Sequence, residues 1–301
     1  FALQGFVIQN GRADQGGGVL AIDVEELYFL GNVFGDNVCT QGWGGAINAY
    51  NVKTLGIGEN RFVNNLATGS NATGGSVLMQ RVSRCEVWDS EFVDNVVADD
   101  CLGGGALSIL SGDVITIRGC NFSSSVAQFS LNGSGGGALL VGDVNIFFVE
   151  GCRFDSNSAY GANGGAISVF PPTLSPRVHI RGCDLRDNTA SASYNGGGAV
   201  AVGYIGLLQI EATNFTKNVA NKTVGGGAIY SYQSEGFRVS GCRSVGNLFD
   251  SGREDDPYYS YVFGGGAIVS DNSDLRIEET TFEDRVRAGV PSTSSGTVAH
   301  T

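Results

Sequence analysis

Residues 44–65 read GGAINAYNVKTLGIGENRFVNN and contain two short words that recur along the whole chain. The first word is Gly44-Gly45-Ala46-Ile47: a glycine pair, a small residue and an aliphatic residue. The second is Phe62-Val63-Asn64-Asn65, an aromatic residue followed three places later by Asn. The two words lie 16 residues apart, and the pair returns at intervals of 28 to 39 residues. A fixed period of this length predicts a repeat protein.

Both words keep the same period independently. The small residue of the first word stands at Gly18, Ala46, Ser76, Ala106, Ala138, Ala166, Ala199, Ala228 and Ala267. The marker of the second word stands at Phe34, Phe62, Phe92, Phe122, Phe154, Leu185, Phe215, Ser244 and Phe282. An earlier Phe6 adds a partial unit, which makes about ten units in the chain.

The residues before each second-word marker alternate between apolar and polar. In one unit Ile115 and Ile117 are apolar, whereas Arg118 follows them on the other face. This spacing of two is that of a strand with one buried face. At the position of Arg118 the next units hold Glu150, Arg181 and Glu211, so the charge alternates from unit to unit. Such alternation indicates parallel pairing of equivalent strands in register.

These patterns predict an all-β fold: a right-handed, single-stranded parallel β-helix of about ten coils. We expect one domain over residues 1–285, as a fragment of a longer chain, and a polar tail or the start of the next segment over 286–301. The Asn of the second word recurs at Asn37, Asn65, Asn95, Asn157, Asn188, Asn218 and Asn247, with Ser125 and Arg285 as exceptions. A residue that recurs in this way is expected to form a structural ladder at a bend, since a catalytic residue is needed once.

Composition argues against several function classes. The formal net charge is -12, and no basic patch is present, so nucleic acid is not an expected partner. No apolar run is long enough for a membrane span. The chain has only two histidines and no Cys-x-x-Cys pair, and we expect neither a metal nor a cofactor. The adjacent carboxylates Asp99-Asp100 and Asp255-Asp256 are interpreted as solvent-exposed residues of long loops. The alternative is that such a pair serves as the general acid and base of a polysaccharide hydrolase.

Five Asn-x-Ser/Thr sequons occur in the sequence. They lie at Asn71, Asn121, Asn132, Asn214 and Asn221. All fall in expected loops or at outward strand positions, which favours glycosylation and an extracellular or cell-surface location.

Seven cysteines leave one unpaired in any disulfide scheme. Cys120, Cys152, Cys183 and Cys242 share one column two residues before the marker, where we favour buried thiols over stacked disulfides. Cys39 and Cys101 both follow the Asn turn and are candidates for a disulfide with each other.

One outward column is unexpectedly apolar. Together with the column two residues further on, it supplies the interface candidates Tyr50, Leu78, Leu110, Leu140, Phe170, Tyr230 and Tyr232. Either a loop or neighbouring domain covers them, or they form a lateral interface or an aromatic platform for glycans. The insertion in the 39-residue unit adds Tyr258, Tyr259 and Tyr261 as loop-binding candidates.

The Gly-Gly-Ala-aliphatic word with Phe-x-x-Asn resembles the repeat of the chlamydial polymorphic outer-membrane proteins, as at 44–65 and at 215–229. The resemblance covers essentially the whole chain and implies a surface-displayed β-helix with an adhesive or structural role. We therefore expect a non-enzymatic segment of a large extracellular or cell-surface glycoprotein, a spacer, adhesin or part of a fibrous assembly. Its partners would be other chains, other domains of the same chain, or glycans. The alternative is a polysaccharide lyase or hydrolase on a β-helix scaffold.

Overall fold

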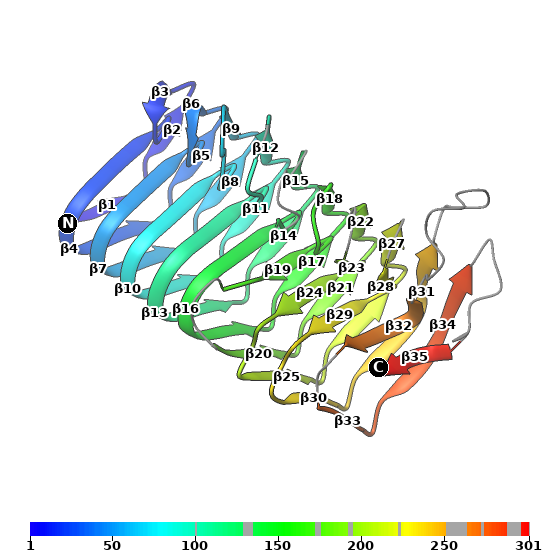
Figure 1. Cartoon of the computed structure of the whole chain (residues 1–301). Coiled ribbons are helices and arrows are strands. Elements are labelled where there is room, and N and C mark those ends of the chain that lie inside the picture. Colours follow the sequence, from blue (N-terminus) through cyan, green and yellow to red (C-terminus); the bar gives the residue numbers. More distant parts are fainter. Residues whose placement is uncertain are drawn as a thin grey trace.

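The computed structural model describes residues 1–99, 101–128, 135–171, 176–191, 195–221, 224–250, 264–271, 274–287 and 296–300. These residues form strands and their connections, without a helix, and their paired strands run parallel. The strands stack into a rod with the two chain ends at opposite ends (Figure 1). The predicted all-β parallel β-helix is confirmed.

The rod has about eight turns, fewer than the ten expected. The difference arises at the ends, where the units are incomplete. The first strand, β1 (Ala2–Gln4), has only three residues and is half exposed, and residues 251–263 and 288–295 of the last two units lie outside the described part. The domain boundary expected at residue 285 stays a prediction; Gly296–His300 forms a strand that pairs with Gly264–Asp271.

Two sheets run along the rod. The first contains β1, β4 (Val19–Leu30), β7 (Ile47–Gly58), β10 (Val77–Trp88), β13 (Leu107–Arg118), β16 (Leu139–Glu150), β19 (Ile167–Val169), β20 (Arg177–Arg181), β23 (Asn195–Gly197), β24 (Val200–Gly203), β25 (Leu207–Glu211), β28 (Val224–Gly226), β29 (Ile229–Tyr232), β30 (Phe237–Ser240), β32 (Gly264–Asp271), β33 (Leu275–Glu278) and β35 (Gly296–His300). In the early coils one twelve-residue strand crosses this sheet. From β19 onward two shorter strands replace it, where Pro171 interrupts the ladder.

The second sheet consists mostly of three-residue strands. It contains β2 (Val7–Gln9), β3 (Arg12–Gln15), β5 (Val33–Gly35), β6 (Val38–Trp43), β8 (Arg61–Val63), β9 (Leu66–Thr68), β11 (Glu91–Val93), β12 (Val96–Ala98), β14 (Asn121–Ser123), β15 (Val126–Ala127), β17 (Arg153–Asp155), β18 (Ser158–Tyr160), β21 (Asp184–Arg186), β22 (Thr189–Ser191), β26 (Asn214–Thr216), β27 (Val219–Asn221), β31 (Arg243–Asp250) and β34 (Thr281–Arg287). Between its paired short strands the chain turns sharply. The turn residue has φ between 52° and 57° at Asp36, Asn64, Asp94, Ser124, Ser156, Asp187 and Lys217.

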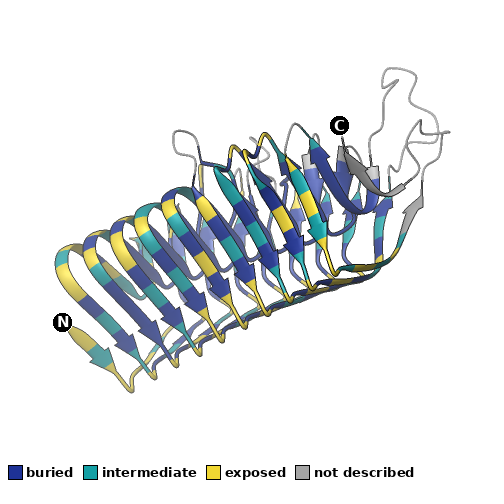
Figure 2. Ribbon diagram, turned by 90° about the horizontal axis from the view of Figure 1, so that it is seen from below, coloured by how far each residue is buried: buried dark blue, intermediate teal, exposed yellow. Residues whose placement is uncertain are grey.

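The core is a stack of equivalent side chains from successive coils, seen as the dark-blue strand positions in Figure 2. Five phenylalanines, Phe34, Phe62, Phe92, Phe122 and Phe154, lie ring on ring with centroids 4.7 to 4.9 Å apart. Leu185 ends this aromatic stack and is buried as well. The spacing is the distance between neighbouring strands of a sheet, so strand pairing itself brings the rings into contact.

The Asn column forms the expected ladder. Asn157 donates its side-chain amide to Asn188 Oδ1 at 3.0 Å, and its backbone N–H donates to the same oxygen at 3.0 Å. At the last coil Asn247 donates to Asp284 Oδ1 at 2.8 Å, so Asp284 occupies the position expected for Arg285. The register of β31 against β34 shifts between Val245 and Leu248, because the last coil is one residue shorter there.

The cysteine column is a second ladder. Its side chains accept the backbone N–H of the preceding coil, whether the residue is Asn, Ser, Cys or Thr: Asn32 donates to Asn60, Cys120 to Cys152, and Cys183 to Thr213. All seven cysteines are buried, and no disulfide joins any two of them. The predicted disulfide between Cys39 and Cys101 is therefore wrong. Cys39 pairs with Ala67 and Ala67 with Val97, so the two cysteines lie two coils apart, roughly 9.6 Å by strand spacing, beyond the reach of a disulfide.

Candidate functional site

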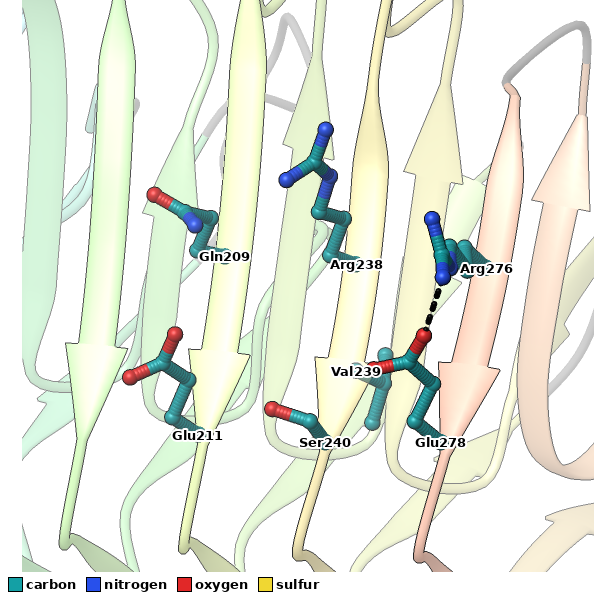
Figure 3. A pocket seen from close by; sticks show the side chains of 7 residues that line it. All are labelled: Gln209, Glu211, Arg238, Val239, Ser240, Arg276 and Glu278. Atoms are coloured by element: carbon teal, nitrogen blue, oxygen red, sulfur yellow. Dashed lines mark ion pairs between the residues drawn. The ribbon is translucent and has the colours of Figure 1, made fainter.

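A polar groove lies on the outer face of the first sheet, near the C-terminal end of the rod (Figure 3). Three parallel strands build it: β25 contributes Gln209 and Glu211, β30 contributes Arg238 and Ser240, and β33 contributes Arg276 and Glu278. The residues between them, such as Ile210 and Val239, are buried in the core. Since side chains alternate along a strand, the polar ones all face outward. The groove encloses about 230 Å³.

The charged side chains of this groove are partly or largely exposed, and two of them form an ion pair. Arg276 Nη2 lies 2.6 Å from Glu278 Oε1, with 70% and 52% of the two side chains exposed. Glu211 Oε2 lies 3.2 Å from His179 Nε2, on the neighbouring coil. Ion pairs this exposed each stabilise the fold by about 1 kcal/mol or less. They offer both donors and acceptors to a polar ligand.

The separation of two carboxylates in the groove is close to that of the catalytic pair in some glycosidases. Glu211 and Glu278 are separated by Ser240 in the sheet register, which places their backbones roughly 9.6 Å apart. Inverting glycosidases hold their two carboxylates about 6.5–9.5 Å apart. However, neither glutamate lies in the apolar surroundings that keep a catalytic acid protonated.

The alternating charges predicted on this face occupy the expected register: Arg118 pairs with Glu150, Glu150 with Arg181, and Arg181 with Glu211. The side chains make a different ion pair from the one expected. Arg118 Nε lies 2.9 Å from Glu86 Oε1, diagonally across from it on the preceding coil. The groove residues Arg238 and Arg276 were not identified from the sequence. The change of one outward column from aromatic to polar at Gln209 was the available signal.

Part of the apolar outward column is covered, which is one of the two interpretations that the sequence left open. Leu78, Leu140 and Tyr230 are at most 5% exposed. The segment before Gly74-Gly75 folds over this part of the sheet: Thr73 Oγ1 donates to Ser108 Oγ at 2.6 Å, and Ser108 pairs with Leu78. Of the two readings left open, coverage by the chain's own loops is the one observed for these three residues.

The remaining interface candidates are half buried. They are Tyr50, Leu110, Phe170 and Tyr232. Arg81 lies over the ring of Tyr50 at 5.3 Å, and Tyr232 contacts Tyr204 edge to face at 5.4 Å. Tyr204 is 50% exposed and was missed, because it stands one residue beyond the column. Their role as an interface stays a prediction.

Tyr230 is the buried centre of this aromatic group, packed with Ala201 and Val269. Burial, followed by the nearby charge of Asp271, raises the pKa of its hydroxyl above the ordinary value. The hydroxyl is therefore held in its neutral form and is unsuited to act as a base at neutral pH.

The sequon residues differ in accessibility. Asn71 and Asn214 are exposed, and Asn71 lies in a turn with φ 60°. Asn121 and Asn221 are half buried, and the Oδ1 atom of Asn121 is buried. Asn132 lies outside the described residues, as do Asp100, Asp255, Asp256, Tyr258, Tyr259 and Tyr261. Glycosylation and the loop-binding role stay predictions.

Among the described residues, no group of three or more His, Cys, Asp and Glu side chains is placed to hold a metal ion. Within the same part of the chain, no helix is long and apolar enough to cross a membrane.

Comparison with known proteins returned no match to a protein-family model, to a curated protein or to a solved structure.

Proposed function

We propose that this chain is a non-enzymatic β-helix segment of a large extracellular or cell-surface glycoprotein, where it acts as a rigid spacer, an adhesin or part of a fibrous assembly. Its partners are other protein chains, other domains of the same chain, or glycans. Neither nucleic acid nor a cofactor enters this proposal.

The observation that carries the proposal is how the buried polar groups are used. Asn65, Asn157, Asn188 and Asn218 each bond to the next coil through the same pair of contacts. Polar side chains of this kind build the rod coil by coil. A catalytic site instead needs a few polar groups that occur once and converge on one point.

Two further features support a location outside the cell. The exposed sequon residues Asn71 and Asn214 suit a glycoprotein. The repeat words resemble those of the chlamydial polymorphic outer-membrane proteins, in which a β-helix is displayed at the surface. The buried thiols are compatible with a location inside or outside the cell, since burial protects them from oxidation.

The groove of Glu211 and Glu278 favours one alternative, a polysaccharide hydrolase or lyase. The test is to incubate the 301-residue chain with neutral and acidic polysaccharides and to measure new chain ends. We expect none, because both carboxylates are open to solvent and Glu278 is held by Arg276. Cleavage that is lost in Glu278→Gln and kept in the exposed control Glu283→Gln would replace our proposal with the enzymatic one.

A further inference from the structure

Two glycines break the pattern of the outer face near the N-terminal end of the rod. Gly56 and Gly58 lie in β7, in the columns that otherwise hold large or polar side chains such as Glu86 and Arg118. Neither has a positive φ, so the backbone there is one that any residue adopts. Glycine inside a strand costs stability. The backbone alone gives no reason for these two glycines.

Two aromatic rings supply the reason. The indole of Trp88 lies across Gly58, where a Cβ would be 2.1 Å from Cε2 and 2.2 Å from Cζ2. The ring of Tyr28 lies over Gly56 from the opposite coil, with Cδ1 2.5 Å from the position of a Cβ. Trp88 Cη2 also reaches Gly56, at 3.4 Å from that position. The two rings therefore converge over the backbone of β7 and bury both glycines.

This arrangement, which we call the aromatic ledge (Tyr28, Gly56, Gly58 and Trp88), leaves ring surface open to solvent. Trp88 and Tyr28 are half exposed, although they are apolar and the sheet beneath them is complete. Charged groups of both signs border the ledge: Glu86 pairs with Arg118 at 2.9 Å, and the two side chains are 46% and 54% exposed.

We propose that the aromatic ledge binds a neutral oligosaccharide, with one sugar ring stacked on the indole of Trp88. The proposal deepens the adhesive role proposed above and rests on it. A pyranose ring has an apolar face of C–H groups, which carry partial positive charge and are attracted to the negative face of an aromatic ring. Its rim of hydroxyl groups needs donors and acceptors, which Arg118 and Glu86 supply.

The charges around the ledge favour a neutral glycan over an acidic one. Glu26 and Arg84 lie on the same face, two residues before Tyr28 and Glu86 along their strands, and both are exposed. With Glu86 and Arg118 they make a border of mixed sign, and the whole chain carries a net charge of -12. An acidic polysaccharide would be repelled by this field. The outer face continues along the rod past Phe148, which is 39% exposed, toward the groove of Figure 3. An extended chain of several sugars would follow this direction.

The sequence offers a direct probe, since Trp43 and Trp88 are its only tryptophans. In the variant Trp43→Phe, indole fluorescence reports on Trp88 alone. The probes are cellohexaose, laminarihexaose and, as an acidic comparison, a hexamer of galacturonic acid. We expect at least one of the two neutral hexasaccharides to change Trp88 fluorescence in a saturable way, and the acidic hexamer to leave it unchanged.

Two substitutions in the otherwise unaltered chain locate the site by calorimetry. Trp88→Ala is expected to weaken binding of that hexasaccharide by about tenfold or more. Gly58→Val keeps the indole but displaces it from the sheet, and is expected to weaken binding to a similar degree. Tyr160→Ala, an exposed aromatic in β18 of the second sheet, is the matched control and should leave binding unchanged. Circular dichroism checks that each variant is folded.

The outcomes separate this inference from the proposed function. Absence of binding by both neutral hexasaccharides, preferential binding of the acidic hexamer, or equal binding by wild type and Trp88→Ala would each overturn the glycan site. None of these results would show that the chain is an enzyme, and a rigid structural segment would remain. Cleavage of a probe would overturn the proposed function instead.

Discussion

Phe122 lies between Phe92 and Phe154, with ring centroids 4.7 and 4.9 Å away and interplanar angles of 8° and 3°. It is fully buried, so Phe122→Ala removes contacts to both neighbouring coils and leaves a cavity. We expect a loss of about 3–5 kcal/mol in the free energy of unfolding. Arg181→Ala, at an exposed position of the outer face, should cost about 1 kcal/mol or less. Equal denaturant midpoints for the two variants would contradict the assignment of inner and outer columns.

Cys152 links protonation to stability. The hydrogen bond with the side chain of Cys120, followed by burial, raises the pKa of the Cys152 thiol from 9.0 to about 12. The folded protein therefore holds this proton more tightly than the unfolded chain. The resulting stability is fully present below pH 9 and is lost as the pH rises through about 12.

Cys152→Ser tests this linkage. Ser and Thr already occupy the same column at Ser90 and Thr213, where their hydroxyls accept the equivalent N–H. At neutral pH we expect the variant to lie within about 1 kcal/mol of wild type. Above pH 9 its free energy of unfolding, measured with urea, should fall less steeply, because one titrating thiol is gone. Identical pH profiles would show that Cys152 does not contribute.

At the scale of the strand, the Gly-Gly word has two distinct requirements. In the first four words the first glycine has a positive φ, as at Gly74 with 66°, whereas Gly136, Gly164, Gly197 and Gly226 do not. The second glycine has no such φ, but a Cβ at Gly75 would lie 1.9 Å from the carbonyl oxygen of Gly105 on the next coil. Close approach of neighbouring coils, in addition to the turn, therefore selects glycine here.

Gly75→Ala is expected to cost more than about 3 kcal/mol, because backbone atoms of the next coil must move. The matched control is Gly151→Ala. Gly151 has φ 61°, yet nothing lies within 4 Å of the position of a Cβ, so only the strained backbone remains, about 1–2 kcal/mol. Thermal unfolding of both variants measures the difference. A smaller loss for Gly75→Ala than for Gly151→Ala would refute the close-approach explanation.

In the long strands, some residues that point away from the core are nevertheless buried. Leu78 directly follows its core neighbour Val77, so the two side chains point to opposite faces of the sheet, but both are buried. The rule of alternation assigns residues to two faces of a sheet, and it does not say what lies on the second face. Here the chain before Gly74-Gly75 returns over that face, which no local pattern in the strand reveals.

At the scale of the whole molecule, one outer face runs along the rod from the aromatic ledge to the polar groove. Coils that are equivalent in the core differ on this face: Gly58, Trp88 and Arg118 are successive members of one column. The core repeats because every coil must pack on two others. The outer face is free of that constraint, and it is therefore where binding specificity can develop.

The sequence by itself determined the repeat, the parallel register, the buried columns and the Asn ladder. Each of these follows from a sequence pattern that recurs once per coil, because parallel strand pairing places equivalent residues of successive coils side by side. Only the tertiary structure decided which outward residues are covered, that Cys39 and Cys101 are too far apart to bond, and that Asp284 closes the Asn ladder. It also brought Trp88 and Tyr28 together over two glycines. These features depend on contacts between side chains in different columns of neighbouring coils. The repeat period tells which residues are equivalent from coil to coil, but it does not tell which side chains of different columns come into contact.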